Sequence, residues 1–117
     1  MAINIKDFKM LAQTAEDAAF AALANRKKLH ARDCGTCNFD KVAIPGGKRM
    51  LKKVEESGLD GYLRTSGMWK GYVLVSAPVF YQGDFNTVQV EAMAKVFKEG
   101  LGYLPGIEGT TIYYQMD

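Results

Sequence analysis

The sequence has one histidine, two cysteines and three prolines in 117 residues, and it contains no long apolar run. No stretch approaches the roughly 20 apolar residues that a membrane-spanning helix needs, so we expect no membrane partner. The first residues show no basic segment followed by an apolar core, which predicts no secretory signal and a cytoplasmic location. The net charge is only +2, so the total charge does not by itself require a nucleic acid.

The composition is that of an ordinary globular protein, with 48% hydrophobic and 24% charged residues. A chain of 117 residues is long enough for one core and too short for two. We therefore predict a single domain, in which residues 1–32 form an N-terminal helix and residues 33–117 form an α+β core.

Hydrophobic periodicity predicts three helices, over residues 3–30, 48–57 and 87–99. Strand-type patterns cover residues 39–44, 61–66, 70–81 and 110–115. After the first helix, the order strand, helix, strand, strand, helix, strand is that of the ferredoxin-like βαββαβ sandwich. This fold has a four-stranded antiparallel sheet with two helices on one face. Because the extra first helix is rich in alanine, it could cover the open face or mediate homo-oligomer formation.

The leading candidate site combines two loops. We expect the first and third strands to be parallel neighbours at the centre of the sheet, so that the loops leaving them meet at one edge. Both loops lead into helix N-termini, whose free N–H groups attract anions. Cations in the first turn of the second helix oppose its dipole, and a bound anion would relieve this repulsion. The ligand-binding residues expected at this edge are Gly46, Gly47, Lys48, Arg49, Gln82, Gly83, Asn86 and Thr87.

A second candidate site follows from Lys70-Gly71-Tyr72-Val73, which partly resembles the third-strand motif of RNA-recognition domains. Such domains stack bases on aromatic rings of the sheet. Here Leu74 and Ala77 replace two of the expected aromatics, and the stripe of tyrosines could instead form core beneath the extra helix. A single-stranded nucleic acid would contact Tyr62, Arg64, Lys70 and Tyr72.

The two cysteines lie three positions apart, and a disulfide is disfavoured in a reducing compartment. His30, Cys34 and Cys37 could bind zinc irregularly, since no second Cys-x-x-Cys is present. A redox dithiol lacks its usual place at the start of a helix. Thiols packed in a tight turn remain the third interpretation, so no cofactor is favoured. No catalytic grouping is visible, and we expect a protein that is not an enzyme.

Three blocks of sequence resemble a family of small, mostly uncharacterised bacteriophage and prophage proteins. The blocks are Cys34-Gly-Thr-Cys-Asn38-Phe-Asp40, then Gln82-Gly with Asn86-Thr-x-Gln89-x-Glu91-Ala-Met93-Ala, and the closing Tyr114-Gln-Met-Asp117. The resemblance spans about residues 33–117 and leaves the first helix uncovered. It implies a viral accessory protein in the host cytosol that counters host defence by binding a host protein or sequestering a nucleotide signal.

These observations favour a non-catalytic phage-type accessory protein that binds an anionic small molecule or a host protein. Two alternatives stay open at this point. One is a single-stranded nucleic-acid-binding module, and the other is a small zinc- or thiol-dependent protein.

Overall fold

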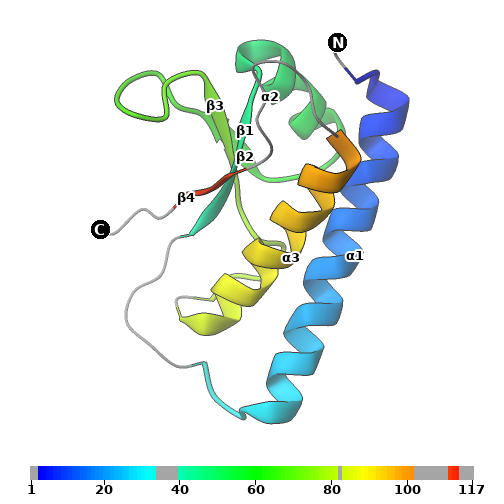
Figure 1. Cartoon of the computed structure of the whole chain (residues 1–117), viewed down its shortest axis with the longest axis vertical. Coiled ribbons are helices and arrows are strands. Elements are labelled where there is room, and N and C mark those ends of the chain that lie inside the picture. The colour runs from blue at the N-terminus through cyan, green and yellow to red at the C-terminus, as the bar shows by residue number, and fades with distance from the viewer. Residues whose placement is uncertain (1–2, 34–39, 82, 102–110, 114–117) are drawn as a thin grey trace.

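The computed structural model describes residues 3–33, 40–81, 83–101 and 111–113, without the side chains of the last segment. Helix α1 spans Ile5–Leu29, α2 spans Gly47–Glu56 and α3 spans Asp84–Leu101. The strands are β1 (Lys41–Pro45), β2 (Gly61–Leu63), β3 (Tyr72–Val75) and β4 (Thr111–Tyr113). The protein is therefore an α+β protein with a long N-terminal helix and an antiparallel sheet (Figure 1).

Helix α1 begins where Asn4 caps it, its Oδ1 accepting from the N–H of Asp7 at 2.8 Å. Three basic residues occupy its last turn, where they complement the negative end of the helix dipole. None of the helices in the described segments is both long and apolar enough to cross a membrane.

The strands are ordered β2-β3-β1-β4, and every pairing is antiparallel. Since β1 and β2 both run antiparallel to β3, they point the same way, as the crossover through α2 requires. The connection over residues 64–71 then reverses the chain, so β2 and β3 form a hairpin. Our expectation that the first and third strands run parallel was therefore wrong. The hairpin makes β3 antiparallel to β2, and because β1 and β2 point the same way, β3 is also antiparallel to β1.

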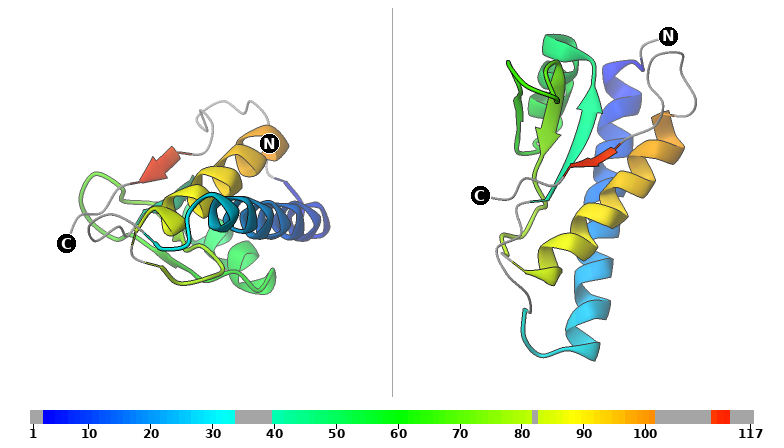
Figure 2. Two further views of the ribbon diagram at one scale, coloured as in Figure 1. Left: turned by 90° about the horizontal axis from the view of Figure 1, so that it is seen from below. Right: turned by 60° about the vertical axis from the view of Figure 1, so that its left-hand side comes forward.

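The core lies on one face of the sheet, between the strands and the three helices. Val73 and Val75 of β3 pack there with residues of β1 and of all three helices. On the other face, Ala43 and Leu74 are also fully buried. The right-hand view of Figure 2 shows α1 and α3 together on one side of the strands.

The alanines of α1 serve the packing of the chain itself. Helices α1 and α3 lie side by side along most of their length (Figures 1 and 2), and the rings of Phe8 and Phe97 stack with centroids 5.8 Å apart. Ala12, Ala15 and Ala19 are buried in the same core, where small side chains permit close approach of the helices. This stripe is therefore not the free oligomerisation surface that its composition suggested.

Candidate functional site

The two loops of the leading candidate site lie at opposite ends of the central strands. In the antiparallel register, Pro45 at the end of β1 faces Tyr72 at the start of β3. The chain from the other end of β3 leads to Asp84, where α3 begins. The predicted two-loop anion site was therefore wrong, because loops that leave antiparallel neighbours exit in opposite directions.

The start of α3 is occupied by contacts within the chain. Both carboxylate oxygens of Asp33 accept backbone hydrogen bonds, from the N–H groups of Gly83 and Phe85 at 2.9 Å each. Asn86 donates to the carbonyl oxygen of Asp40 at 3.2 Å, and the Thr87 hydroxyl lies 3.3 Å from the Asp40 carboxylate. Asn86 and Thr87 thus join α3 to the chain before β1, while Gln82 lies outside the described residues.

Further contacts hold the same end of α3 to the end of α1. Arg26 forms a partly buried ion pair with Asp84, its Nε 2.8 Å from Oδ2. The ammonium of Lys27 lies 5.1 Å from the centroid of the Tyr81 ring, which in turn meets Phe85 edge-on. These pairs explain why α3 starts one turn earlier than its sequence pattern predicted.

The opposite end of the sheet is basic. The N–H of Gly47 donates to the carbonyl oxygen of Gly71 at 2.9 Å, so the start of α2 lies directly beside the start of β3. Gly47 and Gly71 both have positive φ angles, of 61° and 85°. This contact brings exposed cations of α2 next to the hairpin, and we call the resulting surface the basic edge, comprising Lys48, Arg49, Arg64 and Lys70.

Charge is distributed unevenly around this edge. Residues 42–54 and 61–74 contain six lysines and arginines and no aspartate or glutamate, and Glu55 and Glu56 lie at the far end of α2. Helix α2 has no acidic residue in its first turn, and its N-cap Gly46 has no side chain that could accept a hydrogen bond. The positive end of the helix dipole therefore adds to the charge of Lys48 and Arg49.

Aromatic side chains lie beside the basic edge. Tyr62 and Tyr72 lie on the sheet face turned away from the core, since Tyr62 pairs with Leu74 and alternate residues of β3 point to opposite faces. The N–H of Arg64 donates to the carbonyl oxygen of Tyr72 at 2.9 Å. The Trp69 ring meets Tyr72 edge-on with centroids 5.0 Å apart. All four residues expected to contact a nucleic acid thus belong to one hairpin.

This sheet face is accessible only in part. Leu74 lies opposite Tyr62 and two residues from Tyr72 on the same face, and it is fully buried, whereas Tyr62 is 41% exposed. Lys70 is exposed, and Arg64 and Tyr72 are half-buried. A ligand on this face would therefore contact the tyrosines and the hairpin rather than the centre of the sheet.

The expected metal ligands gain no geometric support from the part of the chain that the structure describes. His30 ends α1, where its backbone N–H donates to the carbonyl oxygen of Arg26 at 2.9 Å. Cys34 and Cys37 lie outside the described residues. Within the described segments, no group of three histidine, cysteine or acidic side chains is placed to hold a metal ion.

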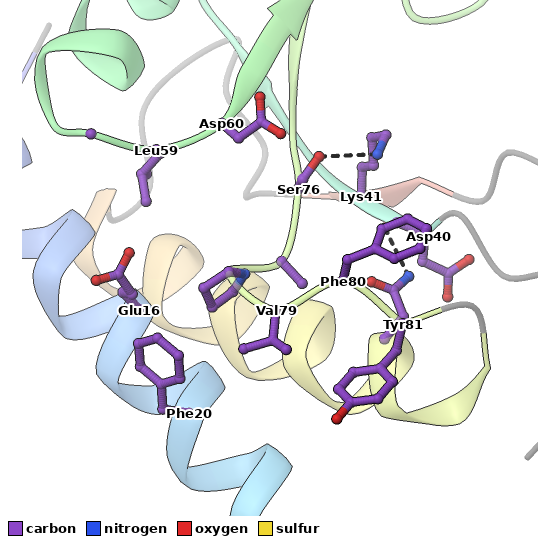
Figure 3. A pocket seen from close by; sticks show the side chains of 14 residues that line it. Glu16, Phe20, Asp40, Lys41, Leu59, Asp60, Ser76, Val79, Phe80 and Tyr81 are labelled. Atoms are coloured by element: carbon purple, nitrogen blue, oxygen red, sulfur yellow. Dashed lines mark hydrogen bonds between the residues drawn. The ribbon is translucent and has the colours of Figure 1, made fainter. Parts of the chain in front are cut away.

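A pocket of about 490 Å³ lies where β3 ends, between the sheet and α1. Carboxylates, aromatic rings and one lysine line it together (Figure 3). The Lys41 ammonium donates to the Ser76 hydroxyl at 3.0 Å on one wall. Its described lining residues include Glu16, Phe20, Asp40, Leu59, Asp60, Val79, Phe80 and Tyr81.

The chain was compared with protein-family models, curated proteins and solved structures, and none of the three comparisons found a match. The candidate sites therefore depend on the geometry of the molecule alone.

Residues far apart in the sequence form the features that periodicity did not reveal. Gln89 is fully buried, and its amide bonds to Val79, so the segment after β3 runs along α3 instead of continuing the sheet. The pocket joins Glu16 of α1 to residues after β3. The local sequence offered only the polar residues Asp84, Asn86, Thr87 and Gln89, and the helix pattern was expected to begin at residue 87.

Proposed function

We propose that this protein is a non-catalytic, single-stranded nucleic-acid-binding protein that holds its ligand at the basic edge. The observation that supports this most directly is the hydrogen bond from Gly47 to Gly71, which brings Lys48 and Arg49 of α2 beside Tyr72 and its hairpin. Two sets of residues, expected from the sequence to serve different ligands, are thereby neighbours.

Cations and aromatic rings are the two components that single-strand binding needs. Lysine and arginine side chains neutralise phosphates, and this term is independent of base sequence. Stacking of a base on an aromatic ring contributes roughly 1–3 kcal/mol per base. Tyr62 and Tyr72 would offer the rings, while Arg64 and Lys70 on the same hairpin would meet the backbone.

In the free protein, the positive end of the α2 dipole repels Lys48 and Arg49, and the first turn of α2 has no acidic residue to offset this repulsion. Each cation in the first turn of a helix is unfavourable by about 0.3–1 kcal/mol at low ionic strength. Phosphate bound near Lys48 and Arg49 would reverse the sign of this interaction. The repulsion between these cations and the helix dipole is thus relieved by a bound anion, which supports a binding role for the basic edge.

The test is binding of fluorescent oligo-dT and oligo-U of about 12 nucleotides, a length within the site sizes of single-strand binders. Affinity should fall with salt, and Lys48→Ala with Arg49→Ala should reduce the salt slope by about 1.4, since each lost phosphate contact removes about 0.7. Lys28→Ala with Lys95→Ala is the matched control, because both are exposed and lie outside the basic edge.

Two results would count against the proposal. Binding that does not depend on salt, or that falls equally in both double variants, would show that the basic edge does not hold the strand. A mononucleotide that binds as tightly as the oligomer would instead support a small anionic ligand at Lys48 and Arg49.

We propose in addition that the sheet is of the four-stranded ferredoxin-like type, a topology on which the open face commonly carries ligand-binding aromatics. The phage-type accessory role and homo-oligomer formation remain proposals from the sequence. Sequestering a nucleic-acid signal of host defence would be compatible with the basic edge.

A further inference from the structure

The pocket beyond β3 differs in chemistry from the basic edge. Three carboxylates line it, from Glu16, Asp40 and Asp60, against a single ammonium from Lys41. The Lys41 ammonium is bonded to Ser76. The lining therefore carries an excess of negative charge, and a polyanion that suits the basic edge would be repelled here.

Two of these carboxylates form no ion pair with a cation of the described segments. Within the described part of the chain, ion pairs join Arg26 to Asp84 and Lys52 to Glu56, and neither involves Glu16 or Asp60. Asp60 is exposed and Glu16 is half-buried, so both can meet a ligand, whereas Asp40 is only 3% exposed. The accessible charge of the pocket is thus two separate carboxylates and the half-buried Lys41 ammonium, which donates to Ser76.

Apolar and aromatic groups lie between and beside these charges. Phe20 is 46% exposed and Phe80 is 75% exposed, so both rings are accessible to a ligand in the pocket. Glu16 and Phe20 are four residues apart on α1, so the carboxylate and the ring share one helix face. In Figure 3 the Phe20 and Phe80 rings stand on different sides of the pocket, with Val79 between them.

We infer that this pocket binds an aliphatic diamine or polyamine, which goes beyond the proposed nucleic-acid binding. Its volume of about 490 Å³ lies within the roughly 300–1,000 Å³ typical of small-ligand sites. Ammonium groups at the two ends of such a ligand pair with Glu16 and Asp60. The carbon chain packs on Leu59 and Val79, and the exposed phenylalanine rings attract the cations by their π faces.

The experiment is isothermal titration calorimetry of the full chain, free of nucleic acid, with spermidine as the probe and 1,8-octanediol as an uncharged comparison. We expect spermidine to bind at one site and the diol not to bind. The double variant Glu16→Gln with Asp60→Asn should weaken spermidine binding by about a hundredfold, on the basis of roughly tenfold per charge-assisted hydrogen bond. Asp60 is exposed, Glu16 is half-buried, and both replacements keep the shape of the side chain, so the variant should fold normally.

Glu91→Gln with Glu99→Gln is the matched control, since both residues are exposed on α3 and neither lines the pocket. It should leave spermidine affinity unchanged. Phe20→Leu and Phe80→Leu keep apolar bulk but remove the π face, and each should weaken binding by roughly threefold.

Several outcomes would overturn the inference. These are equal loss in the two double variants, binding of the diol as tight as that of spermidine, and no spermidine binding at millimolar concentration. Binding of a lysine-containing peptide without binding of spermidine would point to a protein partner instead. Oligonucleotide affinity of the Glu16→Gln, Asp60→Asn variant should not fall. The polyamine site and the nucleic-acid site can therefore be refuted separately.

Discussion

The side-chain amide of Gln89 bonds to both backbone polar groups of Val79. Its Nε2 donates to the Val79 carbonyl oxygen at 3.0 Å, and its Oε1 accepts from the Val79 N–H at 3.1 Å. The amide thus takes the place of a neighbouring strand for one residue of the segment after β3. This segment forms a wall of the pocket, so Gln89 determines where that wall lies.

Replacing Gln89 by leucine should lower the free energy of unfolding by about 2–4 kcal/mol, because two partly buried backbone groups lose their partner. Urea denaturation followed by circular dichroism measures this change. Gln13→Leu is the control, since Gln13 is exposed on α1 and should change stability by less than about 0.5 kcal/mol. Equal effects at positions 13 and 89 would contradict the role of the amide.

Asp33 acts as a cap for α3 although it lies far from that helix in sequence. Its carboxylate accepts from two N–H groups at the start of α3, and a negative charge there also favours the helix dipole. Asp33→Ala should therefore destabilise the protein by about 1–2 kcal/mol, in the range of other lost helix caps. Hydrogen exchange should become faster at the N–H groups of Gly83 and Phe85.

Asp33→Asn keeps the shape of the side chain and one acceptor oxygen, so it should lose less stability than Asp33→Ala. Asp17→Ala is the comparison for removal of an exposed aspartate, because the Asp17 side chain accepts a hydrogen bond from Gln13 of its own helix and does not join two elements. An Asp33→Ala protein as stable as Asp17→Ala would show that this cap has no energetic role.

Arg26 and Asp84 join the end of α1 to the start of α3, and their side chains are 35% and 25% exposed. Partial burial reduces screening, so we expect a coupling energy of about 1 kcal/mol, at the upper end of values for exposed pairs. A double-mutant cycle with Arg26→Met and Asp84→Asn measures it by thermal denaturation. Coupling indistinguishable from zero would mean that other contacts hold the two helices together.

The sequence predicted the helices well because each buries one stripe of side chains at helical spacing. It predicted the third strand over residues 70–81, whereas β3 ends at Val75. Residues such as Val79 and Phe80 have strand-type propensity. Propensity describes single residues, so it takes no account of a hydrogen-bond partner 10 residues away in the chain. The two hydrogen bonds between the Gln89 amide and the Val79 backbone decide the path of this segment instead.

The two candidate sites show the same limit of local reasoning. Tyr62, Arg64, Lys70 and Tyr72 lie within one hairpin, so a local motif was enough to group them. The two-loop site depended on the relative direction of β1 and β3, which the hairpin turn sets, and it was assigned wrongly. The pocket joins Glu16 to Phe80, and no local pattern connects residues so far apart.

The basic edge leads to a prediction in which stability and binding change in opposite directions. Lys48→Glu with Arg49→Glu places two acidic residues in the first turn of α2, which has none and lacks a side-chain cap. Since acidic groups there favour the helix dipole, the variant should be more stable by about 0.5–1.5 kcal/mol at low salt. The same change should abolish binding of oligo-dT, because phosphates would meet carboxylates.

Thermal denaturation and fluorescence anisotropy on the same samples measure the two effects. Lys9→Glu with Lys95→Glu carries the same change of net charge at exposed positions outside the end turns of α1 and α3, so it separates local from overall electrostatics. It should weaken binding much less than the change at positions 48 and 49. A Lys48→Glu, Arg49→Glu protein that is destabilised, or that binds oligo-dT as before, would show that these cations support the helix rather than a ligand.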